Sequence, residues 1–163
     1  MSFRTDTELP IKPAQWSERI GSKMSLAEDL AVGMSAETTI VVTPEMTIAH
    51  FVPGMPQVYA SPMMILHMEI AAGAAIASSL PSGFVSVGMS VDIRHLAATP
   101  IGSRVRAIAR VARIEARSVL FDVEAWNEVR KIGDGTHRRG IVNVLQFEQR
   151  LGVGQTADAR RLH

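Results

Sequence analysis

The sequence contains no cysteine, which excludes disulfides, thiolate metal sites and a cysteine nucleophile from its 163 residues. Aromatic residues are also scarce, at 5%, although hydrophobic residues make up 47%, so Met, Ile, Val, Leu and Ala must fill the core. The formal net charge of +1 is close to balance and gives no reason to expect nucleic acid or an anionic membrane as a partner. The histidines do not show metal-ligand spacing, so neither a metal nor another cofactor is expected.

Long uninterrupted apolar runs are missing as well. The most apolar segment, residues 62–77, is broken by Pro62, His67, Glu69 and Gly73 and falls short of the roughly 20 clean residues that a membrane span needs. The first 15 residues lack the apolar core and cleavage site of a signal peptide. We therefore expect one cytoplasmic domain without a membrane partner.

Proline, glycine and β-branched residues divide the chain. Residues 1–35 are predicted to form an N-terminal arm with a short helix over 25–33, residues 36–150 the domain, and residues 151–163 a flexible tail. A helix is predicted from Ser61 to about Ser79, because Ser-Pro opens it and Pro81 follows its end. Strands are predicted over 38–43, 84–95, 104–114, 118–129 and 136–147, with 46–51 as an extension of the first and 51–59 as a loop.

The two middle strands alternate apolar and charged residues. Residues 105, 107, 109 and 111 are apolar on one face, while arginines 104, 106 and 110 share the other with Ile108. The following strand places Asp122 and Glu124 on its polar face, which predicts cross-strand ion pairs on a solvated surface. One apolar helix followed by antiparallel strands packs best with the sheet curled round the helix. This predicts an α+β hotdog fold, which usually pairs edge to edge into a homodimer.

Glu69 is the most informative residue, because it lies within the apolar helix. A charge there costs several kcal/mol unless it is paired or hydrogen-bonded. One interpretation is a buried acid that is neutralised; the other, which we favour, is an acid used in chemistry together with His95. His95 ends the strand 84–95 and, taken alone, is as well explained by a structural role.

Three other positions carry two interpretations each. Ser61 is either the N-cap of the helix or a hydroxyl at a helix N-terminus, where the dipole favours developing negative charge. Gly88 marks either a bulge in its strand or a close approach of a ligand to the backbone. His67 and His137 are predicted to be packing or interface histidines rather than site residues.

Three segments carry a family resemblance: YASPMMILHME, VGMSVDIRHLAATPIGSRV and KIGDGTHRR. Together they resemble the fluoroacetyl-CoA thioesterase-like group of hotdog thioesterases over about residues 37–147. The resemblance implies that Ser61, Glu69 and His95 form the catalytic set and that Gly88 lies beside the acyl group. The family usually has threonine where this chain has Ser61, and commonly histidine where it has Ser90. Because the loop before Ser61 lacks the aromatic pair of the fluoroacetate-detoxifying member, fluoroacetyl-CoA is not implied as the substrate.

The predicted function is hydrolysis of an acyl-CoA thioester to free acid and CoA in a homodimer, with Ser61, Glu69 or water as the nucleophile. Two alternatives remain at this point: a hotdog acyl-CoA hydratase or dehydratase, and a non-catalytic acyl-CoA binding module.

Overall fold

Residues 29–152 are described by the computed structural model, and one long helix and an antiparallel sheet dominate them. The predicted arm before residue 29, most of the predicted helix over 25–33 and the predicted tail after residue 152 lie outside this range. In chain order the elements are β1 (Ser35–Val41), a 3-10 turn (Pro44–Met46), α1 (Ile48–Phe51), α2 (Ser61–Ile76), a second 3-10 turn (Ala77–Ser79), β2 (Phe84–His95), β3 (Arg104–Ile114), β4 (Ser118–Trp126), β5 (Lys131–Asn143) and α3 (Val144–Arg150).

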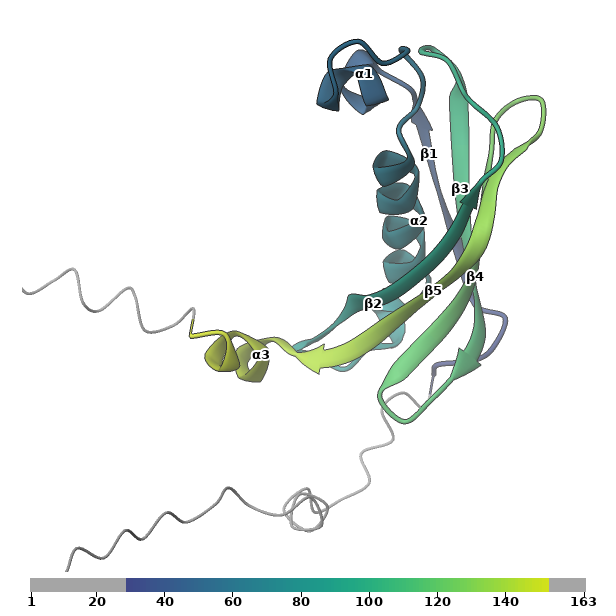
Figure 1. Ribbon diagram of the computed structural model, residues 1–163. Helices are drawn as coiled ribbons and strands as arrows, with labels where there is room; N and C mark the ends of the chain where they lie inside the picture. Colours follow the sequence, from purple (N-terminus) through teal and green to yellow (C-terminus); the bar gives the residue numbers. More distant parts are fainter. Residues whose placement is uncertain (1–28, 153–163) are drawn as a thin grey trace, which may run out of the picture.

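The strands form one sheet in the order β1-β3-β4-β5-β2, with every neighbouring pair antiparallel. The sheet is strongly curved and wraps round α2, while α3 projects from the end of β5 away from the sheet (Figure 1). This is the predicted hotdog arrangement, and the prediction is confirmed. The order leaves β1 and β2 as the two edges, so within residues 29–152 β2 pairs on one side only.

The core lies between α2 and the concave face of the sheet. The alternation predicted for the middle strands is confirmed, because the inward positions of β3 and β4 are all buried: Val105, Ala107, Ala109, Val111, Val119, Phe121, Val123 and Ala125. From α2, Met64, Met68 and Ile76 are fully buried against them. Small residues in β3 leave room for the long methionines of the helix, which explains how a core with few aromatics is filled.

By length and composition alone, the helical segment Ser61–Ser79 is long and apolar enough to cross a membrane, although the sequence analysis predicted that it falls short. Its packing against the concave face of the sheet accounts for part of this apolar character, while Leu66 and Ile70 on its other side are exposed.

Several predicted boundaries are wrong. Residues 46–51 do not extend the first strand, because the 3-10 turn and α1 occupy them. β5 begins at Lys131 rather than 136 and ends at Asn143, where the Asn143 side chain caps α3 by accepting a hydrogen bond from the Gln146 amide. β4 ends at Trp126 and β1 spans 35–41 instead of 38–43. Lys131–Gly135 lacks the apolar alternation of a strand, so pairing with β2 and β4 determines its conformation.

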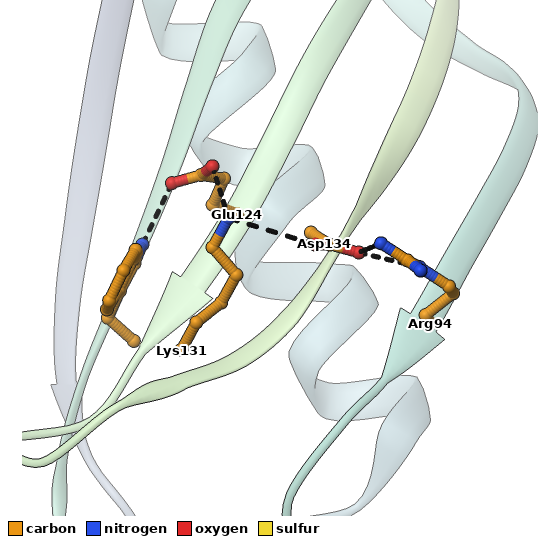
Figure 2. A network of polar contacts seen from close by, with 5 residues as sticks. Arg94, Glu124, Lys131 and Asp134 are labelled. Atoms are coloured by element: carbon orange, nitrogen blue, oxygen red, sulfur yellow. Dashed lines mark hydrogen bonds and ion pairs between the residues drawn. The ribbon is translucent and has the colours of Figure 1, made fainter.

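The convex face of the sheet carries a row of charged side chains across β2, β5 and β4 (Figure 2). Arg94 pairs with Asp134 at 2.8 Å, and Lys131 bridges Asp134 at 3.7 Å and Glu124 at 2.6 Å. Trp126 Nε1 donates a hydrogen bond to Glu124 at 2.9 Å. This network lies on the face opposite α2, as expected for a solvated surface.

The specific pairs predicted between β3 and β4 are not formed in the described residues. Arg106 forms an ion pair with Glu37 on β1 at 3.8 Å instead, and Glu124 forms one with Lys131. The register places Ile108 opposite Glu124, so Arg106 and Arg110 are each two residues away from that position, and Arg110 lies opposite Asp122 instead.

Candidate active site

Ser61 and His95 are brought together, although 34 residues separate them. The Ser61 Oγ lies 2.7 Å from His95 Nδ1, at the start of α2 and the end of β2. Both side chains are exposed and border a pocket that is also lined by Tyr59 and Leu96. A hydroxyl held by an imidazole at a helix N-terminus is suited to orienting a reacting group.

The predicted N-cap role of Ser61 is wrong. The N-cap is Ala60, and Ser61 is the first residue of α2 with Pro62 after it. No side chain caps this end. The Ser61 hydroxyl is therefore not used by the helix amides and is free to bond His95.

Glu69 lies two turns further along α2, about 34% exposed, and its carboxylate contacts a different histidine. Its Oε1 lies 3.4 Å from His137 Nε2 on β5. No ion pair joins Glu69 to His95 anywhere in residues 29–152, so the predicted pairing of these two residues is not made within one chain. It stays a prediction for the assembled dimer.

Gly88 lies directly beneath the Glu69 carboxylate. A Cβ on Gly88 would collide with Glu69 Oε1 and would lie 3.4 Å from His137 Cε1. The strand register shifts between Gly88 and Ser90, so the bulge interpretation is confirmed, while the approach of a ligand stays a prediction. A side chain at position 88 would therefore make the Glu69 carboxylate shift from its place.

His137 and Arg139 complete the surroundings of Glu69. His137 is 0% exposed, and its Nδ1 lies 3.0 Å from the Ser90 carbonyl oxygen. Arg139 bridges three elements: Nε donates to Ser86 Oγ at 2.9 Å, Nη2 to the Ser86 carbonyl at 2.7 Å, and Nη1 to the Glu69 carbonyl at 3.3 Å. These bonds tie α2 to β2 and β5 at the level of the acid.

Burial lowers the pKa of His137, and the Arg139 guanidinium acts in the same direction, while the Ser90 carbonyl and Glu69 oppose the shift. Desolvation is the largest of these effects, so the neutral imidazole is favoured. The sequence analysis predicted a structural or interface role for His137. Its place beside Glu69 was missed because 68 residues separate the two, and only the packing of α2 against β5 brings them together.

His67 is buried, as predicted for a packing histidine. Its Nδ1 lies 2.5 Å from the Tyr59 hydroxyl, and the two rings are stacked with centroids 6.0 Å apart. Burial lowers the pKa of His67 and raises the pKa of Tyr59, so both side chains are neutral. Tyr59 precedes Ser61 by two residues, so this pair anchors the start of α2.

The described residues contain no group of three or more His, Asp or Glu side chains that could hold a metal ion.

Comparison with known proteins places this architecture in a family. Residues 42–145 match the family of the fluoroacetyl-CoA-specific thioesterase. The fluoroacetyl-CoA thioesterase of Streptantibioticus cattleyicolor is 31% identical over 132 residues, which cover 77% of this chain and 95% of that protein.

Comparison with solved structures leads to the same family. A structure of the fluoroacetyl-CoA thioesterase superposes with a TM-score of 0.72 at 32% identity, covering 76% of this chain and 96% of that one. A variant of the same enzyme has been solved in complex with acetyl-CoA. A thioesterase superfamily member from Thermus thermophilus gives a TM-score of 0.71 at 35% identity, covering 80% and 99% of the two chains. The resemblance of the three sequence segments is thus confirmed, and the chain belongs to the fluoroacetyl-CoA-specific thioesterase family.

Proposed function

We propose that this thioesterase hydrolyses an acyl-CoA at a site composed of Ser61 and His95 from one subunit and Glu69 from the other subunit of a homodimer. Family membership provides the reaction class, because the relatives are named as acyl-CoA thioesterases. The single observation that carries the proposal is the division of the predicted catalytic residues into two separate clusters within one chain, Ser61 with His95 and Glu69 with His137.

The two clusters are held apart by helix geometry. Ser61 and Glu69 are eight residues apart on α2, which corresponds to about 12 Å along a helix that rises 1.5 Å per residue. One thioester carbonyl cannot touch both side chains at that separation. A complete site therefore needs a second copy of the chain.

An unpaired edge and an exposed apolar surface support the dimer. β2 is an edge strand, and its exposed side chains include Met89 at 62% and Val91 at 45%. Leu66 and Ile70 on α2 are 43% and 48% exposed beside it. A long, apolar edge strand favours pairing with another strand, and a second copy of β2 is complementary to it.

The positions of the site residues along α2 and along β2 are consistent with one two-fold axis between the subunits. Antiparallel α2 helices that cross near residue 65 place Ser61 opposite Glu69 of the partner subunit. Antiparallel β2 strands centred between residues 91 and 92 place His95 opposite Gly88 of the partner subunit. In both pairings, the Ser61–His95 cluster of one subunit lies next to the Glu69 cluster of the other subunit. A single two-fold axis therefore completes two equivalent sites.

In the proposed mechanism, Glu69 of the partner subunit takes a proton from water, and the resulting hydroxide adds to the thioester carbonyl carbon. Backbone N–H groups near Gly88 or the start of α2 stabilise the oxyanion, an effect worth roughly 3 kcal/mol per donor in other enzymes. Collapse breaks the C–S bond, and protonated His95 delivers its proton to the departing CoA thiolate; the proton held by Glu69 then returns to His95, which restores both groups for the next turnover. The Ser61 hydroxyl, bonded to His95 Nδ1, holds the imidazole in position.

Subunit complementation tests the proposal directly. Glu69→Gln and His95→Ala are each expected to reduce thiol release from acetyl-CoA and longer acyl-CoA substrates by at least about 100-fold, the usual contribution of a general acid or base. When the two inactive variants are mixed and allowed to exchange subunits, each hybrid dimer regains one intact site. Activity should return to about a quarter of wild type, because half of the dimers are hybrids with one working site in two.

The control is a chain that carries both substitutions, mixed with either single variant, which restores no site. Thiol release that is unchanged in both single variants would overturn the catalytic assignment. Inactive single variants that never complement, although subunit exchange is demonstrated, would place the whole site within one subunit.

A further inference from the structure

The short helix α3 exposes apolar side chains and packs against little of its own chain. Leu145 near its start and Leu151 at its end are 70% and 62% exposed. Its main contact within residues 29–152 is with β5, the strand that leads into it. A helix of seven residues is marginal in water unless it packs against something, so we expect another surface to cover these side chains.

The start of α3 lies beside the edge strand that we assign to the dimer. Asn143, which caps α3, pairs with Phe84 at the start of β2, and the Val144 amide donates a hydrogen bond to the Gly83 carbonyl at 3.0 Å. From there α3 projects away from the sheet, on the side of the sheet that carries α2 and α1 (Figure 1). It therefore lies next to the edge along which a second β2 would pair.

The proposed two-fold axis brings α3 level with the partner's site. When antiparallel β2 strands are centred between residues 91 and 92, Phe84 lies opposite Thr99 of the partner subunit. This position directly follows residues 96–98, which line the pocket of the candidate active site. Two strand spacings of about 4.8 Å separate β5 from the partner's β2, and a helix of this length spans about 10 Å. α3 is thus long enough to reach the partner's pocket.

The surface that would receive α3 is apolar. The pocket beside Ser61 and His95 has a volume of about 350 Å³, and among residues 29–152 no Asp, Glu, Lys or Arg side chain lines it. α1, whose first residue Ile48 lines the pocket, also carries Phe51, which is 51% exposed, and Met55 in the loop that follows is 46% exposed. Since no charged group has to be desolvated, apolar side chains of α3 are complementary to this surface.

We propose that α3 of one subunit packs over the pocket beside Ser61 and His95 of the other subunit, where Leu145 forms an apolar wall of the substrate site. This inference rests on the proposed function, because it uses the dimer in which Ser61 and His95 meet Glu69 of the partner subunit. A pocket closed in this way excludes water from one side of the thioester. It selects acyl-CoA substrates whose part bound there is apolar.

Because the sequence contains no cysteine, cross-linking tests the contact directly. In a chain that carries Leu145→Cys and Met55→Cys, a short bismaleimide should convert the protein to covalent dimers, since these two positions meet only between subunits. The control is Leu145→Cys with Glu37→Cys, because Glu37 is 56% exposed on β1, the opposite edge of the sheet. Equal yields of covalent dimer from both pairs, in a protein that sediments as a dimer, would overturn the inference and leave the shared site standing.

Hybrid dimers provide a second test, by activity. In a mixture of Glu69→Gln and His95→Ala chains, the working site takes Ser61 and His95 from the Glu69→Gln chain, so α3 of the His95→Ala chain covers it. Leu145→Ser in the His95→Ala chain should raise the KM of the hybrid about 10-fold with little change in kcat, as expected for loss of one buried leucine contact. In the Glu69→Gln chain the same substitution falls on the inactive site and should not raise KM.

The placement of the substitution separates a contact between subunits from a general defect. A KM that responds equally to both placements, or to neither, would contradict the inference. Hybrid dimers that regain no activity would instead refute the proposed function, and cross-linking would still decide whether α3 lies on the partner subunit.

Discussion

At the scale of single residues, the site is determined by which partner each polar side chain finds. Ser61 and Glu69 were both identifiable from the sequence, since each is a polar residue at an unusual place in an apolar helix. The division of their partners was not, because His95 of the predicted set contacts Ser61 while Glu69 contacts His137, and only the packing of α2 against the sheet determines these contacts. The N-cap prediction for Ser61 failed for a related reason: Ala60 occupies the cap position, and the hydroxyl forms a bond to a residue far away in the chain.

The buried histidines give the protein a pH-dependent stability. Burial lowers the pKa of both His67 and His137 below the usual value of 6.5. Between that value and the lower folded-state pKa, the unfolded chain binds more protons, so the free energy of unfolding should decrease as the pH falls below about 6.5. The slope is at most about 1.4 kcal/mol per pH unit for each proton taken up.

Urea unfolding between pH 5 and 8 measures this dependence. The double variant Tyr59→Phe/His67→Leu removes one buried imidazole together with its hydroxyl partner and should flatten the curve on the acidic side. An equally steep curve in the variant would show that His67 does not contribute.

At the scale of elements, strands and the long helix were predictable to different degrees. β2 and β3 have the predicted bounds because alternation and flanking Gly and Pro agree there. α1 and α3 were missed, since helices of four and seven residues are too short to show a periodic pattern and depend on tertiary packing. The start of β5 was missed because its first residues carry no strand signal.

Two glycines allow a test of how α2 meets the sheet. At Gly73 on α2, a Cβ would lie 3.6 Å from Arg139 Nη2, an ordinary contact, so Gly73→Ala should stabilise the protein by up to about 1 kcal/mol through helix propensity. At Gly88 a Cβ would displace the Glu69 carboxylate, so Gly88→Ala should reduce thiol release about as severely as Glu69→Gln.

Thermal unfolding and thiol release, measured on both variants, separate the two effects. Full activity in Gly88→Ala would show that the position of Glu69 above Gly88 is not needed for catalysis.

At the scale of the whole molecule, the edge strand β2 exposes apolar side chains that no contact within the described part of the chain covers. Val91 and Leu66 lie on the surface that we assign to the dimer. Val91→Lys and Leu66→Lys should therefore shift the protein from dimer to monomer and abolish thiol release while leaving the fold intact.

Sedimentation velocity and circular dichroism check this prediction. Val129→Lys is the matched control, because Val129 is 80% exposed in the turn before β5, outside both β2 and α2, and should leave both assembly and activity unchanged. A wild-type protein that sediments as a monomer at the concentration of the assay would contradict the shared site.

The spacing of Ser61 and Glu69 on one helix also restricts how this protein can vary. Deleting a single residue between them would rotate everything downstream by about 100°. The same deletion would swing Met68 and Ala72 out of the core and carry Glu69 away from Gly88. A change in the length of α2 would thus disrupt the core, and with it the fold, even where the catalytic groups were kept. The loop that precedes α2 is not subject to this restriction on its length. In this helix, a change of substrate preference is accordingly expected from substitution of residues and not from a change in their number.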